Sequence, residues 1–281
     1  MFCELFGYTK QAYYKQFNNQ VKGLQCNQQL KDAVLMIRHQ MPRLGGRKLH
    51  FLLKTSHPIG RDRFFDLLRK ENMLIYRRKK YTVTTNSKHW MRKYPNLVKE
   101  LVVNRPEQLW VADITYIDTL QGNAYLHLIT DAYSKQIMGF ELCNNMESTS
   151  TLKALNMAVT NRRYKDKPLI HHSDRGLQYC SKLYIDKLTD NGITISMTET
   201  GSPYDNAVAE RINGILKDEF GLGERMEDLQ VAKCHTKQSI EIYNHLRPHL
   251  SCCLLTPKQM HQQQTLKIKT YKKTLNTLVS V

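Results

Sequence analysis

The chain has 281 residues, enough for a buried core and two or three domains, and its formal net charge is +17. Residues 1–106 hold 22 of the 42 Lys and Arg residues but only 6 of the 25 acidic ones, so the excess charge lies in the first third. A basic module joined to a near-neutral one favours an arm that holds a polyanion and a second part that acts on it. A solubility or ribosome-type extension is the alternative for the basic third.

Cysteine usage and hydropathy argue against a secreted or membrane protein. The seven cysteines include no C-x-x-C pair and no zinc-finger spacing, so we expect reduced thiols, mostly in the core. No apolar run approaches the ~18 residues of a membrane span. The N-terminus lacks a basic-then-apolar signal pattern, and we therefore expect an intracellular protein with no membrane partner.

Helical periodicity predicts two helices near the N-terminus, over residues 8–24 and 28–40. The first carries Tyr13, Tyr14 and Phe17. These aromatic side chains could pack in a core or stack on nucleic acid, and we expect them in the core.

The next segment has the pattern of a helix-turn-helix. Two short helices, residues 45–54 and 61–73, flank a turn that contains Pro and Gly. If this module binds DNA, Arg61, Arg63 and Arg69 are candidate contacts on its second helix, the recognition helix. Helix pairs of this pattern also occur in proteins that bind nothing, so the basic charge carries the prediction.

Residues 76–93 combine basic and aromatic side chains. Such interleaving fits phosphate contacts with base stacking, and it also fits a solvated linker between domains. The candidate DNA contacts of this segment are Arg77, Arg78, Lys79 and Lys80.

From residue 108 the periodicity changes to that of strands. Five short segments rich in β-branched and aromatic residues are predicted strands: 108–118, 124–133, 136–143, 168–174 and 193–198. Helices are predicted between and after them, over residues 150–162, 180–191 and 202–220. An antiparallel meander followed by alternating helices and strands predicts a mixed α/β fold, with three layers around a central sheet.

The last predicted helix, SPYDNAVAERINGILKDEF (202–220), has two distinct faces. At about 100° per residue, four apolar residues gather on one side: Ile212, Ile215, Leu216 and Phe220. Glu210 and Lys217 lie on the opposite side. Taken alone, this is an amphipathic surface helix, so its meaning depends on what lies upstream.

Two carboxylates earlier in the chain lie at positions where packing alone does not call for a charged side chain. Asp113 interrupts WVADITYI, which otherwise has the sequence of a central strand, and a carboxylate there needs a partner. Asp174 ends the fourth strand, in HHSDRGLQY, where ligand groups collect in open α/β sheets. Each carboxylate alone is most simply solvated, but together with Glu210 they can converge on one edge of the sheet.

Three adjacent carboxylates suit a hard cation, Mg²⁺ or Mn²⁺. Without a cation they would repel one another and raise one another's pKa. Two such ions ~3.5–4 Å apart serve an in-line phosphoryl displacement, so we expect two ions held by Asp113, Asp174 and Glu210.

These three blocks resemble those of the DDE transposase and integrase superfamily. As in that family, 35 residues separate Asp174 from Glu210, and Lys217 follows Glu210 by seven. The chain is most similar to the integrase-like transposases of bacterial insertion sequences, the orfB-type proteins of the second reading frame. YNHLRPH (243–249) followed by LLTP (254–257) matches their C-terminal signature, so the resemblance covers nearly the whole chain. The His/Cys zinc module of retroviral integrases is not matched.

The resemblance implies an RNase H-like mixed five-stranded sheet flanked by helices, preceded by an all-α helix-turn-helix DNA-binding region. It implies metal-dependent DNA strand cleavage and strand transfer by Asp113, Asp174 and Glu210. Further DNA contacts are expected from Lys217, Tyr204, Asn206 and Arg211. The expected division is a helix-turn-helix region (1–75), a basic linker (76–106), a catalytic integrase core (107–222) and a C-terminal helical segment with a basic tail (223–281).

The expected partner is double-stranded DNA, as element ends and as target. Two DNA ends must be brought together, so a homo-multimer is expected, located in the cytoplasm at the nucleoid. In this group an upstream reading frame is usually joined by frameshifting, so an upstream-frame protein or a frameshift fusion is a further candidate partner.

Two alternatives share much of this pattern. An RNase H-like nuclease that cuts without joining has the same carboxylates; Lys217 and the large basic arm favour joining. A non-enzymatic DNA-binding repressor derived from a transposase is disfavoured, because a decayed copy has no reason to keep all three carboxylates.

Several polar residues near these blocks have simpler explanations than ligation. We expect Asp131 to be structural, and His171 and His172 to be held by hydrogen bonds at the end of a strand. His245 and His249 flank Pro248 and are expected to pack against the catalytic domain.

Overall fold

The computed structural model describes residue 7 and residues 9–76, 93–199 and 207–263. The chain divides into two compact units, Met1–Lys79 and Lys80–Val281. This two-unit division does not test the predicted four-part division of the chain, which stays a prediction.

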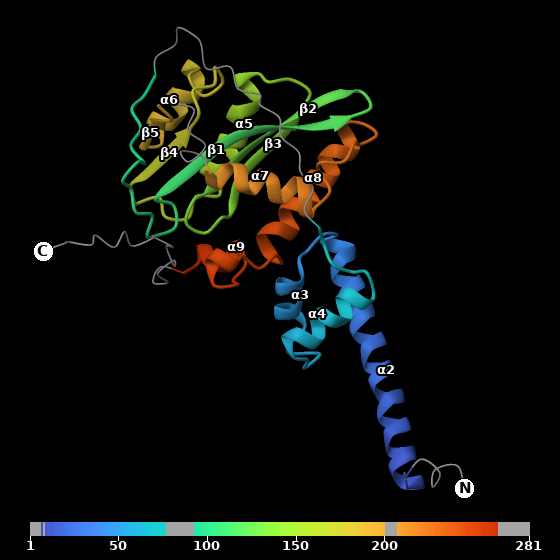
Figure 1. Cartoon of the computed structure of the whole chain (residues 1–281). Helices are drawn as coiled ribbons and strands as arrows, with labels where there is room; N and C mark the ends of the chain where they lie inside the picture. The colour runs from blue at the N-terminus through green and yellow to red at the C-terminus, as the bar shows by residue number, and fades with distance from the viewer. Residues whose placement is uncertain (1–6, 8, 77–92, 200–206, 264–281) are drawn as a thin grey trace, which may run out of the picture. The chain divides into compact units, whose positions relative to one another are not determined.

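The first unit is helical. Its elements are α2 (Lys10–Gln40), α3 (Gly46–Leu53) and α4 (Arg61–Lys70) (Figure 1). Its core consists of buried aliphatic and aromatic residues of all three helices: Leu30, Val34, Leu49, Leu53, Phe64 and Leu68. The two short helices expected of a helix-turn-helix are therefore present.

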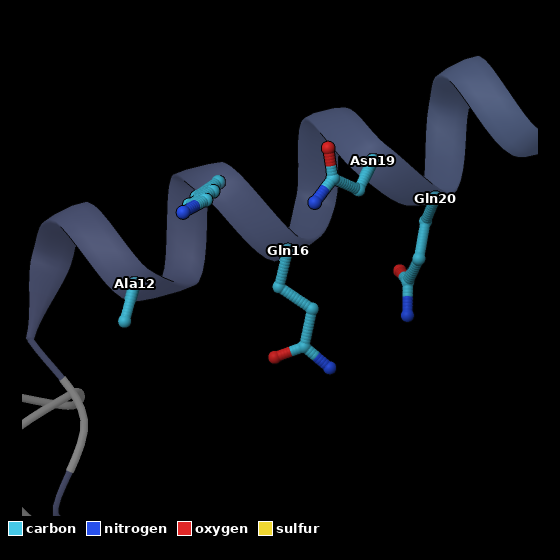
Figure 2. Close-up of a pocket in the computed structure, with 5 residues that line it drawn as sticks. Ala12, Gln16, Asn19 and Gln20 are labelled. Atoms are coloured by element: carbon cyan, nitrogen blue, oxygen red, sulfur yellow. The ribbon is translucent and has the colours of Figure 1, made fainter.

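The prediction for the start of this unit was wrong in two respects. A single helix of 31 residues runs through the stretch where two were expected, because Gly23 costs an exposed helix only about 1 kcal/mol. Tyr13, Tyr14 and Phe17 are 51–62% exposed rather than buried. Figure 2 shows Ala12, Gln16, Asn19 and Gln20 along the same part of α2, lining an open depression of this helix.

The second unit contains one five-stranded sheet in the order β3-β2-β1-β4-β5. The strands are β1 (Leu109–Thr119), β2 (Gly122–Asp131), β3 (Ile137–Cys143), β4 (Leu169–Ser173) and β5 (Ile193–Met197). β1 pairs antiparallel with β2, and β2 with β3, while β4 pairs parallel with β1 and β5 pairs parallel with β4. The expected mixed sheet is confirmed, with every strand within three residues of its predicted bounds.

Helices cover both faces of this sheet. Trp110 and Ala112 of β1 pack with the residues of α5 (Ser148–Thr160) and α6 (Lys182–Asp190). Leu109 and Val111 face the other way, toward Ala209 of α7 (Ala207–Glu219) (Figure 1). Successive side chains of a strand point to opposite faces of the sheet. Asp113 therefore shares the face of Leu109 and Val111, which is the face that α7 covers.

The chain continues through α8 (Leu229–His245), a 3₁₀ turn (Leu250–Cys252) and α9 (Pro257–His261). The six described cysteines are free thiols, as expected, but only Cys252 is buried, so the expected core placement was wrong. None of the described helices combines the length and hydropathy that crossing a bilayer requires.

Candidate active site

Asp113 lies at the middle of the central strand, where its side chain is half-buried. Burial raises the pKa of its carboxyl to about 7, and the negative charge of Asp174 adds to that rise, as does Glu210. Hydrogen bonds from the Ile114 amide and from Asn213 oppose the rise. Asp174 and Glu210 are therefore both near enough to Asp113 for their charges to raise the pKa of its carboxyl.

Asp174 is the residue directly after β4. The parallel register pairs Val111 with His172, so its continuation by two residues brings Asp174 beside Asp113. Oδ1 of Asp174 accepts a hydrogen bond of 3.0 Å from the Gly176 amide, which turns the chain back. A Cβ at Gly176 would lie 3.0 Å from the same oxygen, so a glycine allows this tight turn.

Glu210 is exposed in the first turn of α7. A carboxylate there is favoured by the positive end of the helix dipole. The predicted apolar face of the helix is buried: Ile212, Ile215, Leu216 and Phe220 are each at most 2% exposed. Packing of that face against the sheet holds Glu210 on the side of Asp113.

Asn213, one turn after Glu210, was not singled out from the sequence. Its Nδ2 donates to Oδ2 of Asp113 over 2.6 Å, while its buried Oδ1 has no hydrogen-bond partner among the described residues. The sequence could have indicated Asn213 through its polar side chain, which lies one turn after Glu210 at the border of the apolar face.

Lys217 lies two turns beyond Glu210, and its Nζ is 4.3 Å from the centroid of the Tyr116 ring. Arg211 is exposed on the same helix. The predicted contacts Tyr204 and Asn206 lie outside the described residues.

The predicted DNA contacts on α4 are exposed. Arg61 bonds to Asp62 over 2.9 Å and Arg69 to Asp66 over 2.5 Å, while Arg63 is exposed on the same helix, α4. Arg77, Arg78, Lys79 and Lys80 fall outside the part of the chain that the structure describes.

The chemistry of the carboxylate cluster fits a divalent cation. Mg²⁺ or Mn²⁺ would neutralise hard oxygen donors such as these, and the pKa of Asp113 is raised in part by the charges of Asp174 and Glu210. Within residues 9–76, 93–199 and 207–263, however, no three His, Cys, Asp or Glu side chains are close enough together to hold an ion as they stand. The three carboxylates are near one another, but not at ligand spacing.

Comparison with known proteins agrees with this geometry. Two models described as "Integrase core domain" match residues 103–203 and 191–257. A 31 kDa protein of insertion element IS600 from Shigella sonnei is 32% identical over 266 residues, covering 93% of this chain and 97% of that protein. The chain belongs to the integrase-core family of insertion-sequence transposases.

Two further relatives support this assignment. Transposase InsF of insertion sequence IS3A from Escherichia coli K12 is 31% identical over 198 residues, covering 70% of this chain and 68% of InsF. A chain of the simian T-cell lymphotropic virus intasome, solved in complex with PP2A regulatory subunit B56 gamma, is similar with a TM-score of 0.50 and 19% identity. That match covers 82% of this chain and 75% of the other. It bears on the fold alone, and it confirms the expected RNase H-like sheet.

In this transposase the two histidines before Asp174 are structural, as expected. His171 bonds through Nε2 to the Tyr184 hydroxyl over 2.9 Å, and His172 through Nδ1 to the Ser196 hydroxyl over 2.8 Å. Burial lowers the pKa of His171 to about 3, so its ring is neutral.

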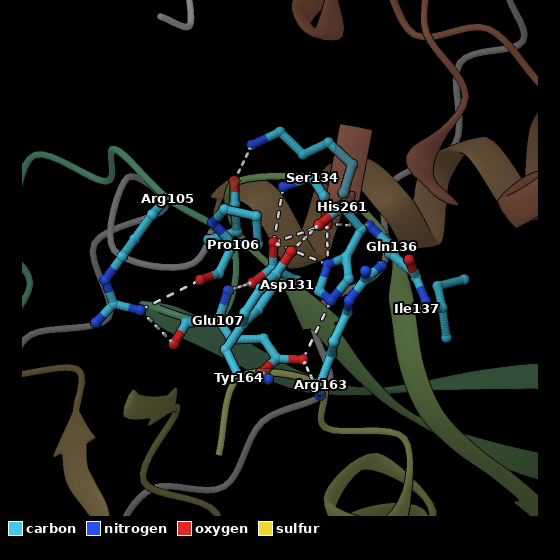
Figure 3. A network of polar contacts seen from close by, with 12 residues as sticks. Arg105, Pro106, Glu107, Asp131, Ser134, Gln136, Ile137, Arg163, Tyr164 and His261 are labelled. Carbon is cyan, nitrogen blue, oxygen red and sulfur yellow. Dashed lines mark hydrogen bonds and ion pairs between the residues drawn. The ribbon is translucent and has the colours of Figure 1, made fainter. Parts of the chain in front are cut away.

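Asp131 is also structural, as expected, and it belongs to a buried network that the sequence did not indicate (Figure 3). It accepts hydrogen bonds of 2.7 Å from the Glu107 amide and from the amide and hydroxyl of Ser134. His261 of α9 bonds through Nε2 to Glu107 over 3.1 Å and through Nδ1 to Ser134 over 3.0 Å. The network ties α9 to the start of β1 and the end of β2, which lie together at one end of this antiparallel pair.

The residues of the C-terminal signature YNHLRPH hold this segment against α7 and β3. Arg247 is 1% exposed and bonds both carboxylate oxygens of Glu219, at the end of α7, over 2.8 Å each. Asn244 bonds the backbone N–H and C=O of Ile137. His249 is buried and bonds the Tyr243 hydroxyl of α8, whereas His245 is exposed, which corrects its predicted packing against the catalytic domain.

Proposed function

We propose that Asp113, Asp174 and Glu210 form the catalytic centre of this transposase and hold its divalent ions, two in number. The observation that supports this is the effect of Asp174 and Glu210 on Asp113: three elements far apart in sequence bring three negative charges together. When bound, Mg²⁺ or Mn²⁺ activates the attacking oxygen and stabilises the leaving one.

The proposed reaction has two steps. Water first hydrolyses a phosphodiester at an element end, which leaves a 3′-hydroxyl. That hydroxyl then attacks a target phosphodiester, so a new strand bond forms as a target bond breaks. The chain supplies alignment, because β1, the end of β4 and α7 are fixed by the core, and it needs no protein nucleophile.

The proposed substrate is double-stranded DNA. Lys217 and Arg211 lie on the helix that carries Glu210, and Arg61, Arg63 and Arg69 are exposed on α4 of the basic unit. Joining of two element ends to a target calls for more than one copy of the chain. An upstream-frame protein or fusion, and a location at the nucleoid, follow from the same proposal.

The deciding experiment is strand transfer of a labelled element-end duplex into plasmid with Mg²⁺, for the wild type and Glu210→Gln. We expect transfer by the wild type and a loss of at least about 100-fold in the variant, since removal of one such charge from a catalytic site costs on this order. Asp218→Asn is the matched control, because Asp218 is an exposed carboxylate on the same helix.

Each other outcome has a definite meaning. Equal transfer by Glu210→Gln refutes the role of Glu210. Cleavage without joining by the wild type supports the nuclease alternative, and DNA binding without either step supports the repressor alternative.

A further inference from the structure

Tyr116 and Lys217 form a contact that the proposed chemistry leaves unused. The ammonium of Lys217 lies over the face of the Tyr116 ring, 4.3 Å from its centroid. Both side chains are half-buried. The ring face attracts a cation electrostatically, and the attraction strengthens as water is removed.

Both partners are held by rigid backbone. Tyr116 belongs to the central strand, where it pairs with Tyr125 of β2. The Lys217 carbonyl accepts a hydrogen bond of 3.2 Å from the Gly223 amide, and a Cβ on Gly223 would approach that oxygen within 3.2 Å. The chain therefore fixes the base of the lysine side chain, and the ring fixes its tip.

The contact runs parallel to the carboxylate cluster. Tyr116 follows Asp113 by three residues, about 10 Å along a strand, and Lys217 follows Glu210 by seven, about 10 Å along a helix. Asn213 bonds Asp113 between these points. β1 and α7 thus carry the carboxylates of Asp113 and Glu210 at one position, and the Lys217 ammonium about 10 Å farther along.

This spacing determines what the ammonium can meet. One strand of a duplex rises about 3.4 Å per nucleotide, so about 10 Å corresponds to about three nucleotides. A DNA strand that ran along β1 and α7 from the carboxylates would bring a neighbouring phosphate to the level of Lys217. A lysine side chain has four rotatable bonds, and the contact with the ring restricts them.

We propose that Tyr116 is a positioning residue that holds the Lys217 ammonium ready for a DNA phosphate a few nucleotides from the reacting one. The inference rests on the proposed function. It assigns the ring of Tyr116, and not its hydroxyl, to the handling of the substrate.

The test is a double-mutant cycle on binding of a labelled element-end duplex, measured by fluorescence anisotropy without divalent metal. Tyr116→Leu is expected to weaken binding about 3- to 30-fold, the range of a partly desolvated cation–π contact. Tyr116→Phe keeps the ring and is expected to bind within twofold of the wild type. In a Lys217→Met background, Tyr116→Leu is expected to have no further effect, because the cation is gone.

A second measurement separates positioning from damage to the fold. In strand transfer with Mg²⁺, Tyr116→Leu is expected to raise KM for the duplex and to leave kcat within about threefold. Thermal unfolding of every variant checks the fold. Lys153→Met removes an exposed lysine of α5 and controls for the loss of one positive charge.

The outcomes distinguish this inference from the function beneath it. If Tyr116→Leu binds as tightly as the wild type, or weakens binding equally with and without Lys217, the inference is wrong and the proposed function stands. If the wild type neither binds nor joins element ends, the proposed function fails and the inference fails with it.

Discussion

Nδ2 of Asn213 donates to Oδ2 of Asp113 over 2.6 Å, which links α7 to β1 at the proposed catalytic centre. The bond orients one carboxylate oxygen of Asp113. It also opposes the rise in the pKa of Asp113 that burial and Asp174 cause.

The first prediction concerns this bond. Asn213→Ala is expected to lower strand transfer about 10- to 100-fold, because a hydrogen bond to a charged group contributes about 1.5–3 kcal/mol. Strand-transfer rates with saturating DNA and Mg²⁺ measure the effect. Asn213→Asp, which adds a fourth carboxylate, is expected to be at least as impaired. Unchanged rates in Asn213→Ala would show that the bond has no part in the reaction.

The second prediction concerns the contact of β3 with α5. A Cβ at Gly139 would lie 2.1 Å from the Ala154 carbonyl oxygen and 2.7 Å from the Ala158 amide nitrogen, both backbone atoms. Gly139→Ala is therefore expected to lower the free energy of unfolding by about 3 kcal/mol, since α5 must move away from the sheet. Urea denaturation measures the change.

Gly214→Ala is the control for that measurement. A Cβ at Gly214 meets nothing within 4 Å, and the position is inside α7. This substitution is expected to stabilise the protein by up to about 1 kcal/mol. A loss in both variants would mean that the close approach at Gly139 is not the cause.

Much of the sheet was predictable because its strands carry their own pattern. β1 alternates between two buried faces, so Asp113 was visible as an exception, and Asp174 and Glu210 followed from their places at the end of a strand and the start of a helix. The apolar face of α7 was equally visible, because a period of 3.6 residues places its members on one side.

The parts that failed lack such a local signal. Glu107 and His261 bond across 154 positions, and no periodicity connects them. Tyr13, Tyr14 and Phe17 were expected in a core because aromatic residues are usually buried, but in the described part of the first unit they stay 51–62% exposed. Asn213 was hidden among apolar neighbours whose burial explained the helix without it.

The third prediction concerns the ion pair of Arg247 with Glu219, which are 1% and 15% exposed. Arg247→Met is expected to lower the free energy of unfolding by about 3–5 kcal/mol, because it removes the cation that bonds both oxygens of a largely buried carboxylate. The control is Arg225→Met, which breaks an exposed pair with Asp118 at 3.2 Å and is expected to cost under about 1 kcal/mol. Equal, small losses in urea denaturation would refute a structural role for the signature arginine.

The fourth prediction is a pH dependence of stability that originates at His261. Burial alone would lower the pKa of its imidazole, but the nearby carboxylates of Asp131 and Glu107 outweigh burial and raise the pKa to about 9. The folded value thus lies above the unfolded value of about 6.5. The native state binds the extra proton, so this contribution is complete below about pH 6.5 and is lost as pH rises through about 9.

The difference of about 2.5 pH units corresponds to about 3 kcal/mol. The free energy of unfolding of the wild type, measured in urea at pH 6, 7.5 and 9.5, is expected to fall relative to that of His261→Gln over this window. His261→Gln should itself be less stable at pH 6, because the buried carboxylates of Glu107 and Asp131 then lose the imidazolium between them. His245→Gln is the control, since His245 is exposed and should follow the wild type. If His261→Gln loses stability between pH 6 and 9.5 as much as the wild type does, the proton is not held at His261.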